Sequence, residues 1–551
     1  MIINGVPKFA KPENSPFISF ERYSESRKKL DAEIYRLRGL CDPIVQKNRG
    51  IYQLPIIVGG RKIYTTEKRQ SLVPHKKGTV LAEYSLCNKQ DVSKAIEGVL
   101  KAREGWAKIP WFMKLHIFWT AAELLEKKYI YKMTAAVMEE FSKNPFEAFI
   151  DVQELIDFWR FNVYYAQEIY KEQPDTTTAA FNMLDHRPLE GFVFAVPPNN
   201  FIAIGGNLPT APLLMGNVVV TKPSRDVTYC FHLVMDILFE AGLPMDVIAV
   251  LHGDSSMIGE TVLNHPELSG IHFTGGTDTF NSLVKKTGEN VDLYKDYTRL
   301  VGETGGKDFI VIFDDADLEA SASAIVVGGF GYQGQKCSAT SRIYVRQGTW
   351  AKLEPILLKL MDEIKVGDVA DYHNFMGAII NEKAFRQKTK YIDAAKADPN
   401  VRVVGGKYDD TKGWFIHPTL IITDKIDYVT VEEELFAPIV TICTLPDETP
   451  DSAMTSLCDL TSPYALTGAV HTGDVGAFCE ATNELRYAAG NFYNWKTTGA
   501  MVGKQPFGGA RKSGTAGKVG WIDNLRKWTS PRAISLMTLK PSSPFPPCLD
   551  K

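Results

Sequence analysis

The chain has 551 residues, of which 44% are hydrophobic and 23% are charged, and its formal net charge is -3. This length predicts two or three domains with a large buried core. The small net charge argues against nucleic acid or a membrane surface as a partner, and the most apolar region is interrupted by proline and asparagine before it could span a bilayer.

The sequence indicates neither a targeting segment nor a metal site. Residues 1–29 carry no apolar signal core and no arginine-rich amphipathic pattern, so we expect a cytoplasmic protein. The eight cysteines are scattered, without a CxxC pair or a cluster with histidine. This spacing predicts no metal site and no disulfide framework, and each cysteine is expected to stay a free thiol.

The first part of the chain predicts a hairpin followed by long helices. A Gly-Gly pair separates two β-prone runs within 54–65, which is a hairpin pattern. Asn88 and Asp91 then suit the start of a helix whose apolar residues recur every three or four positions. A second apolar face follows over 114–129. We expect 131–170 to be helical and to serve only core packing.

From residue 190 onward the pattern alternates strand, loop and helix, which predicts a parallel sheet wound with helices. The strand-like runs are GFVFAV (191–196), NVVVTKP (217–223), DVIAVLHG (246–253) and GIHFTGGT (270–277). A second α/β region is predicted to begin near 308–313 and to continue through 436–445. The tail from residue 531 begins like a strand and ends rich in proline, so it is either a pairing arm or a mobile end.

Two features at the ends of predicted strands suit a nucleotide. The usual GxGxxG fingerprint is absent. Gly275 and Gly276 follow a strand and precede a helix, so backbone N–H groups there can approach a pyrophosphate. Lys222 closes another strand, at the sheet edge where open α/β folds bind ligands. Taken alone, the Gly-Gly pair is equally typical of an ordinary turn, and Lys222 is equally typical of a solvated strand end.

Two further features are a carboxylate and a thiol. Glu303 is flanked by glycines, and we expect a tight turn that exposes its carboxylate to a cleft, as a general base requires. Cys337 lies in a polar, glycine-rich loop beside Lys336, and we expect this surrounding to lower the pKa of the thiol and make it a nucleophile. The order of all four features along the chain favours one shared cleft.

These features belong to a series of motifs that resembles the aldehyde dehydrogenase superfamily from about residue 35 to 540. The matching segments are VPPNNF (196–201), VTKPS (220–224), FTGGT (273–277), GETGGK (302–307), GQKCSA (334–339), EEELFAPIV (432–440) and QPFGGARKSG (505–514). Within the superfamily, AAGNFY (488–493) and KWTSPRAI (527–534) are similar to the 1-pyrroline-5-carboxylate dehydrogenase branch.

The resemblance implies an α/β aldehyde dehydrogenase fold in three parts. It implies a Rossmann-like nucleotide-binding domain over 1–165 and 187–304, an α/β catalytic domain over 305–485, and a small β oligomerisation flap with a C-terminal arm over 166–186 and 486–551. It also implies a homo-oligomer, either a dimer or an assembly of dimers.

The implied reaction is the NAD(P)-dependent oxidation of L-glutamate 5-semialdehyde, the open form of 1-pyrroline-5-carboxylate, to L-glutamate, the second step of proline degradation. Cys337 would attack the aldehyde, and the side-chain amide of Asn200 and the backbone N–H of Cys337 would hold the oxyanion. Glu303 would activate the water that hydrolyses the thioester. Chemistry of this kind needs no metal.

The implied binding residues follow from matching positions in the motifs. Those for NAD are Lys222, Ser224, Gly276, Thr277, Glu434 and Phe436. Arg225 is compatible with a 2′-phosphate, so NADP is a possible alternative. The residues implied for the substrate are Ser338, Gly499 and Ala500 around its α-carboxylate, and Phe201 and Phe507 along its aliphatic stem.

The sequence leaves two other functions open. One is an aldehyde dehydrogenase that acts on another semialdehyde or on an aliphatic aldehyde. The other is a non-catalytic binding or structural protein with the same fold. The presence of both Cys337 and Glu303 argues against the second alternative.

Overall fold

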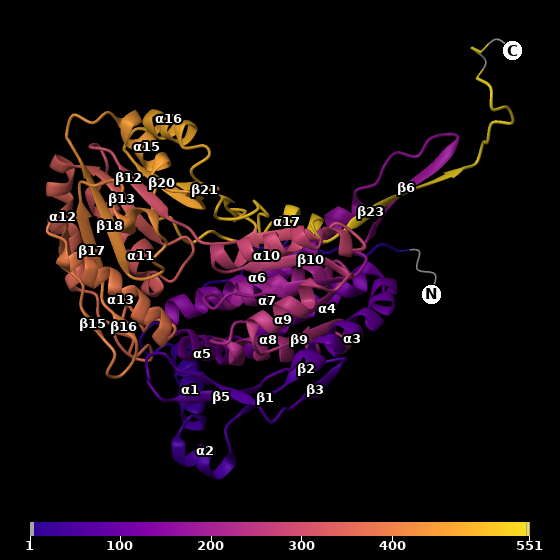
Figure 1. The fold of residues 1–551 in the computed structure, drawn as a ribbon, viewed down its shortest axis with the longest axis horizontal. Helices are drawn as coiled ribbons and strands as arrows, with labels where there is room; N and C mark the ends of the chain where they lie inside the picture. The colour runs from indigo at the N-terminus through magenta and orange to yellow at the C-terminus, as the bar shows by residue number, and fades with distance from the viewer. Residues whose placement is uncertain (1–4, 547, 550–551) are drawn as a thin grey trace.

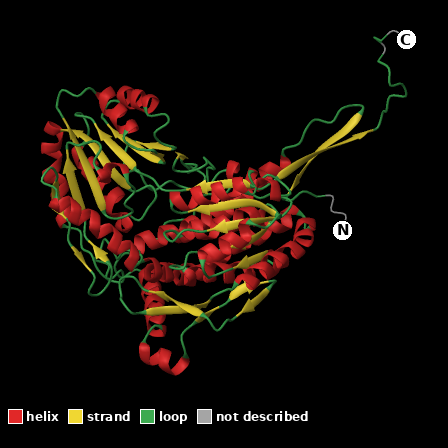
Figure 2. Cartoon of the chain, in the orientation of Figure 1, coloured by secondary structure: helices red, strands yellow, loops and turns green. Residues whose placement is uncertain are grey.

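Two seven-stranded sheets, each packed with helices, organise the chain (Figures 1 and 2). The computed structural model describes residues 5–546 and 548–549. Strands between residues 56 and 303 build the first sheet, and strands between residues 308 and 493 build the second. Figure 1 shows the second sheet on the left, the first in the middle, and a two-stranded ribbon that points away from both.

The first sheet is mainly parallel. Its strands are β2 (Ile56–Val58), β3 (Arg61–Ile63), β7 (Phe192–Val196), β8 (Val218–Thr221), β9 (Ile248–Val250), β10 (Leu268–Thr274) and β11 (Arg299–Glu303). They lie in the order β11-β10-β7-β8-β9-β2-β3. The first five are parallel to one another, and β2 is antiparallel to both of its neighbours, β9 and β3. The predicted strand and helix alternation and the predicted hairpin are both confirmed.

The strands at the centre of this sheet are almost entirely apolar because helices cover them. β8 and β9 are buried throughout, as expected for a parallel sheet shielded from water. The helices of this region are α3 (Lys89–Lys108), α7 (Ile202–Leu214), α8 (Thr228–Glu240), α9 (Ser255–Leu263) and α10 (Thr277–Glu289). α3 begins at the possible caps that the sequence indicates, and Asn88 and Asp91 form a reciprocal capping pair there.

The N-terminal part of the chain is mainly helical. Its helices are α1 (Glu25–Leu40), α2 (Pro43–Arg49), α4 (Trp111–Leu124), a π-helical turn (Leu125–Tyr129), α5 (Ile130–Phe141) and α6 (Pro145–Lys171). The prediction of unbroken helix over 131–170 is wrong at one place. Ser142 adopts a left-handed backbone with φ 57°, and Asn144 then accepts a hydrogen bond from the N–H of Glu147 to start α6.

The second sheet is also mainly parallel and begins where the sequence predicts. Its strands are β12 (Asp308–Ile312), β13 (Thr340–Arg346), β14 (Arg402–Gly405), β17 (Thr419–Thr423), β18 (Ile439–Leu445), β20 (Thr467–His471) and β21 (Asn491–Tyr493). Their order is β14-β17-β18-β13-β12-β20-β21, and only β14 is antiparallel to its neighbour. The helices around it are α11 (Leu318–Phe330), α12 (Gln347–Asp362), α13 (Glu382–Ala397), α14 (Val429–Glu432), α15 (Asp451–Leu460) and α16 (Val475–Glu484).

Short elements complete the fold. A three-stranded sheet contains β1 (Gln53–Leu54), β4 (Lys68–Leu72) and β5 (Val80–Ser85), and two small pairs contain β15 (Tyr408–Asp409) with β16 (Phe415–Ile416) and β19 (Tyr464–Ala465) with β22 (Ala510–Arg511). The ribbon pairs β6 (Ala180–Arg187) with β23 (Ser530–Met537), and α17 (Ile522–Arg526) precedes β23. Single 3₁₀ turns are Met245–Val247, Val291–Leu293 and η4 (Gly331–Gly334).

The start of the tail is a pairing arm, because β23 pairs with β6 in a continuous antiparallel register. The predicted domain boundaries stay a prediction. β21 lies within the 486–551 segment assigned to the flap and pairs with β20 at the edge of the second sheet.

In the part of the chain that the structure describes, no helix is both long and apolar enough to cross a membrane. Those same residues include no group of three or more His, Cys, Asp or Glu side chains placed to hold a metal ion.

Candidate active site

The loop that carries Cys337 joins α11 to β13 in the second sheet. It begins with the turn η4, in which Tyr332 and Gln333 have left-handed backbones with φ 51° and 55°. This conformation is unfavourable for residues other than glycine, so surrounding contacts have to maintain it. Cys337 itself is partly exposed and lies just before the buried strand β13.

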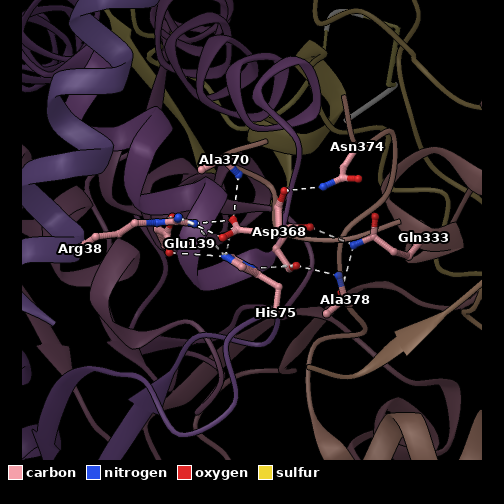
Figure 3. Close-up of polar contacts among 9 residues, drawn as sticks. Arg38, His75, Glu139, Gln333, Asp368, Ala370, Asn374 and Ala378 are labelled. Carbon is pink, nitrogen blue, oxygen red and sulfur yellow. Dashed lines mark hydrogen bonds and ion pairs between the residues drawn. The ribbon is translucent and has the colours of Figure 1, made fainter. Parts of the chain in front are cut away.

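The side chain of Gln333 connects this turn to two other segments by hydrogen bonds (Figure 3). Its Nε2 donates hydrogen bonds to the carbonyl oxygens of Ser142 and Ala378, each at 2.9 Å. The hydroxyl of Ser142 accepts a hydrogen bond from the N–H of Ala378 at 2.7 Å. The left-handed turn of the Cys337 loop is therefore held against the break between α5 and α6.

The same network reaches the N-terminal helix α1. His75 Nδ1 lies 3.0 Å from the hydroxyl of Ser142, and His75 Nε2 lies 3.5 Å from Glu139 and 3.6 Å from Asp368. Arg38 donates to both carboxylates, through Nε to Glu139 at 2.7 Å and through Nη1 to Asp368 at 3.0 Å. Figure 3 shows Arg38, Glu139, His75 and Asp368 meeting at one point. A network of side chains, joined to Gln333 through the backbone carbonyl oxygen of Ser142, thus connects α1 to the turn before the thiol.

A cavity of about 110 Å³ opens beside Cys337. It is lined by all five residues that the sequence assigns to the substrate, although they come from distant parts of the chain. These residues are Phe201, Ser338, Gly499, Ala500 and Phe507. The walls are mainly apolar side chains with a few polar groups, which is typical of a small-molecule site.

The turn that contains Gly499 is tied directly to the Cys337 loop. The hydroxyl of Thr497 donates to the carbonyl oxygen of Ser338 at 2.7 Å and lies 2.9 Å from the hydroxyl of Thr340. Gly499 has a backbone φ of 96°, a conformation that residues other than glycine rarely adopt. These contacts fix the predicted carboxylate site relative to the predicted nucleophile.

Asn200 and Phe201 are placed by a buried carboxylate of α6. Asp151 accepts hydrogen bonds from the N–H groups of Ile202 and Ala203 at 3.0 and 2.9 Å, so it caps α7, whose own N-cap residue supplies no side-chain acceptor. Asn200 is buried, and its Nδ2 donates to the carbonyl oxygen of Gln335 at 3.2 Å. A side-chain amide has a second N–H, which this bond does not use.

Glu303 ends β11 and is buried, which differs from the expected exposed carboxylate. Its Oε2 accepts a hydrogen bond from the N–H of Gly509 at 3.0 Å, and its Oε1 has no hydrogen-bond partner among the described residues. Burial raises the pKa of Glu303 to about 8, although the bond from Gly509 opposes the shift. A flanking glycine predicts a close approach of backbone, but it does not predict how deeply the carboxylate lies.

The expectation that Lys336 lowers the pKa of Cys337 is wrong. Lys336 Nζ forms an ion pair with Glu147 at 2.7 Å. Its positive charge is therefore paired with the Glu147 carboxylate and not with the Cys337 sulfur. Burial, and after it the negative charges of nearby carboxylates such as Asp308, raise the pKa of the Cys337 thiol well above its usual value.

Four of the residues predicted to bind a nucleotide lie at the carboxyl ends of strands in the first sheet. Lys222 and Ser224 follow β8, Gly276 precedes α10, and Thr277 is the first residue of α10. A Cβ at Gly276 would meet no atom within 4 Å, so the space beside the helix N-terminus is open. The N–H of Gly275 donates to the carbonyl oxygen of Glu303 at 3.2 Å, which places this turn next to the end of β11.

The other two predicted nucleotide residues follow α14. Glu434 Oε1 accepts a hydrogen bond from the N–H of Gly306 at 3.0 Å, so it contacts the loop that follows Glu303. Phe436 has a left-handed backbone with φ 52°. This segment therefore reaches from the second sheet toward the end of the first, although no bond joins Glu434 to Lys222 in the described part of the chain.

Sequence reasoning missed the charged residues in the cavity wall. Glu147, Glu154 and Lys496 line it, as does Lys336, which the sequence associates only with the pKa of the thiol. The two glutamates belong to α6, which the sequence assigns to core packing alone. A carboxylate at the position of Glu154, one turn from apolar residues on either side, is the signal that would have identified this face of the helix.

Comparison with known proteins agrees with the motifs. The sequence pattern of the aldehyde dehydrogenase family matches residues 64–534. The chain is similar to the mitochondrial delta-1-pyrroline-5-carboxylate dehydrogenase of Dictyostelium discoideum, with 41% identity over 95% of this chain and 93% of that protein. It is similar in structure to the delta-pyrroline-5-carboxylate dehydrogenase of Mycobacterium tuberculosis bound with NAD, with TM-score 0.93, 40% identity and 99% of each chain covered. A 1-pyrroline-5-carboxylate dehydrogenase from Thermus with bound NAD gives TM-score 0.87 at 28% identity, covering 97% of this chain and 100% of that one.

The protonation state of Cys337 can be measured by alkylation. Since the thiolate is the reactive form and burial raises the pKa of the Cys337 thiol, we expect iodoacetamide to modify Cys337 slowly at pH 7 and faster as the pH rises. Peptide mass spectrometry reports the extent of labelling, and exposed Cys479 in the same sample serves as the control for reagent activity. A midpoint below about pH 8 would instead support activation of the thiol by Lys336.

Proposed function

The chain belongs to the aldehyde dehydrogenase family, and on that premise we propose that it oxidises L-glutamate 5-semialdehyde, the open form of 1-pyrroline-5-carboxylate, to L-glutamate with NAD, the second step of proline degradation. One observation carries the proposal. A single cavity brings the Cys337 thiol together with Ser338, Gly499 and Ala500, so a substrate with a carboxylate at one end and an aldehyde at the other fits the arrangement.

The residues at the ends of β8 and β10 suit NAD. The open space at Gly276 and the N-terminus of α10 offer backbone N–H groups to a pyrophosphate, and Lys222 offers a donor to ribose hydroxyls. Glu434 would accept from the other ribose, and Phe436 would flank the nicotinamide. Use of NADP instead stays a prediction that rests on Arg225, which is exposed.

Aldehyde oxidation would begin at sulfur. The Cys337 thiol gives its proton to solvent, and the resulting thiolate forms a bond to the aldehyde carbon as the carbonyl π bond breaks. The carbonyl oxygen then carries a negative charge, which the second N–H of Asn200 and the backbone N–H of Cys337 would stabilise. Asn200 needs little rearrangement for this role, because its bond to Gln335 already holds it beside the loop.

The second half of the reaction would depend on Glu303. NAD, when bound, supplies the hydride acceptor that converts the adduct on Cys337 into a thioester. Glu303 would take a proton from water as that water attacks the thioester carbon, and the bond between sulfur and carbon then breaks to release L-glutamate. A carboxylate whose pKa is about 8 is a stronger base than an ordinary glutamate once it has ionised.

The cellular compartment and the assembly belong to the same proposal. We expect a cytoplasmic homo-oligomer, most simply a dimer, although the Dictyostelium relative carries the word mitochondrial in its name. Support for an oligomer comes from the ribbon of β6 and β23, which projects from the body (Figure 1). An isolated two-stranded ribbon is marginally stable in water, and a second copy would cover it.

The substrate is tested by comparing aldehydes. We expect kcat/KM for L-glutamate 5-semialdehyde to exceed the values for succinate semialdehyde and hexanal by about tenfold or more, because those aldehydes misplace or lack the carboxylate. NADH absorbance is the readout, and Cys337→Ala should abolish turnover of all three. A preference for succinate semialdehyde or hexanal would support the alternative aldehyde dehydrogenase. Failure to bind NAD would support a non-catalytic protein.

The role of Glu303 is tested by pH and substitution. Because a base acts only when ionised, steady turnover of the wild type should rise with pH and level off above about pH 8. Glu303→Gln should give one rapid burst of NADH followed by turnover slowed about 100-fold or more, without the rise. Glu319→Gln, an exposed position in α11, is the control. Normal turnover without a burst in Glu303→Gln would show that another group activates the water.

The role of the ribbon as an oligomer interface is tested by measuring the molecular mass in solution. Phe181, Met183 and Leu536 on the ribbon are 49%, 38% and 63% exposed. Introducing charge through Met183→Glu together with Leu536→Glu should convert the wild-type oligomer into a 61.4 kDa monomer in light-scattering measurements. Tyr35→Glu, at an exposed position of α1, should leave the mass unchanged. If the ribbon variant keeps the wild-type mass, the interface lies elsewhere.

A further inference from the structure

The N-terminal segment, the described residues 5–20, forms neither helix nor strand, yet hydrogen bonds hold it along α6. The N–H of Phe9 donates to Gln167 Oε1 at 2.6 Å, and Gln167 Nε2 donates to the carbonyl oxygen of Phe9 at 3.0 Å. Farther along, Arg160 Nη1 donates to the hydroxyl of Ser15 at 3.2 Å. The segment is therefore a fixed part of the fold although it lacks regular secondary structure.

Aromatic packing fixes the same segment to the start of α6. The ring of Phe17 lies 5.6 Å from the rings of both Phe146 and Phe149, and the ring of Phe20 lies 5.4 Å from that of Phe149. These contacts are edge-to-face, a geometry that aromatic pairs favour. Phe146 also lines the cavity, so the segment supports one of its walls.

One turn of α6 contacts both the N-terminal segment and the cavity. Asp157 is 4% exposed, and its Oδ1 accepts a hydrogen bond from the N–H of Ser15 at 2.8 Å. Its Oδ2 accepts from Asn14 Nδ2 at 2.9 Å. The next residue, Phe158, lines the cavity together with Ile150. The position of this wall is thus coupled to the position of Asn14.

The side chain of Asn14 also reaches the opposite wall. Its Nδ2 donates a second hydrogen bond to the carbonyl oxygen of Val502 at 2.9 Å. A side-chain amide nitrogen carries two N–H groups, and these two bonds use both of them. Val502 is buried and follows the turn of Gly499 and Ala500, which lines the cavity. One nitrogen therefore joins α6 to the segment that carries the turn.

The turn is held on both sides by such contacts. Before Gly499, the hydroxyl of Thr497 donates to the carbonyl oxygen of Ser338 at 2.7 Å, which fixes that side to the Cys337 loop. After the turn, the bond from Asn14 to Val502 fixes the other side to α6. Loss of the second contact would free one side of the turn and leave the thiol loop in place.

We propose that Asn14 is a positioning residue for the substrate, because it holds the turn of Gly499 and Ala500 against α6 in the place where the turn binds the substrate's carboxylate. The inference rests on the proposed function, which assigns the carboxylate to that turn. Asn14 acts through Asp157 and Val502. Without it, both would keep a buried acceptor with one partner fewer, and the turn would shift to compensate.

The test measures KM and kcat separately for L-glutamate 5-semialdehyde and for hexanal, which has no carboxylate. Asn14→Leu keeps a side chain of similar size and removes both N–H donors. KM for the semialdehyde should rise about tenfold while kcat and the KM for hexanal stay within about twofold of the wild type. Asn14→Gln, which keeps the amide, should recover part of the loss. Asn48→Leu, at an exposed position of α2, is the matched control.

The outcomes separate the two proposals. If the wild type does not prefer the semialdehyde to hexanal, the proposed function fails. If the wild type shows that preference but Asn14→Leu keeps the wild-type KM for the semialdehyde, Asn14 does not position the turn. An equal loss of kcat/KM for both aldehydes would indicate a general structural role and would also overturn the inference. Should Asn14→Leu fail to fold, Asn14→Ala, which adds no bulk, is measured against the same two aldehydes.

Discussion

The active-site arrangement depends on a backbone conformation that the chain does not favour by itself. Tyr332 and Gln333 are consecutive non-glycine residues with left-handed backbones, and each costs about 1 to 3 kcal/mol unless its surroundings compensate. The compensation comes from Gln333, whose amide bonds two carbonyl oxygens, one of them at the left-handed break of Ser142. Two unfavourable turns thus stabilise each other, and Cys337 is held at the cavity.

Charge pairing around the cavity sets the chemistry of the thiol. Buried ion pairs add little net stability, but they fix where each charge lies. Lys143, paired with Asp151, lies 3.8 Å from the ring centre of Phe201, and Asp151 in turn caps the helix that follows Asn200 and Phe201. Lys336 is held by Glu147 in the same way. Burial, together with the carboxylates that remain near the sulfur, raises the pKa of the Cys337 thiol.

The sequence predicts the architecture and much of the candidate site because motifs mark strand ends. The parallel strands and the capped helix at Asn88 follow from local pattern, whereas Ser338 and Gly499, which line the cavity with Cys337, were implied by the resemblance to the family. The ion pairs and the pKa shifts at the site cannot be predicted in this way, because they depend on contacts between residues that are distant in the sequence. Lys336 is adjacent to Cys337 in the sequence but pairs with Glu147 in the fold, and Glu303 is buried by the segment around Gly509. Glu154 was hidden for the same reason, since helical periodicity does not reveal what a helix faces.

The central claim is that the Cys337 sulfur forms the covalent bond to the substrate. The most direct measurement is an acid quench of the wild-type protein within the first turnover with L-glutamate 5-semialdehyde and NAD, followed by peptide mass spectrometry of all eight cysteines. The account predicts an acyl group on the peptide that contains Cys337 and on no other cysteine. NADH formation with an unmodified Cys337 peptide at every quench time, or an acyl group on a different cysteine, would contradict it.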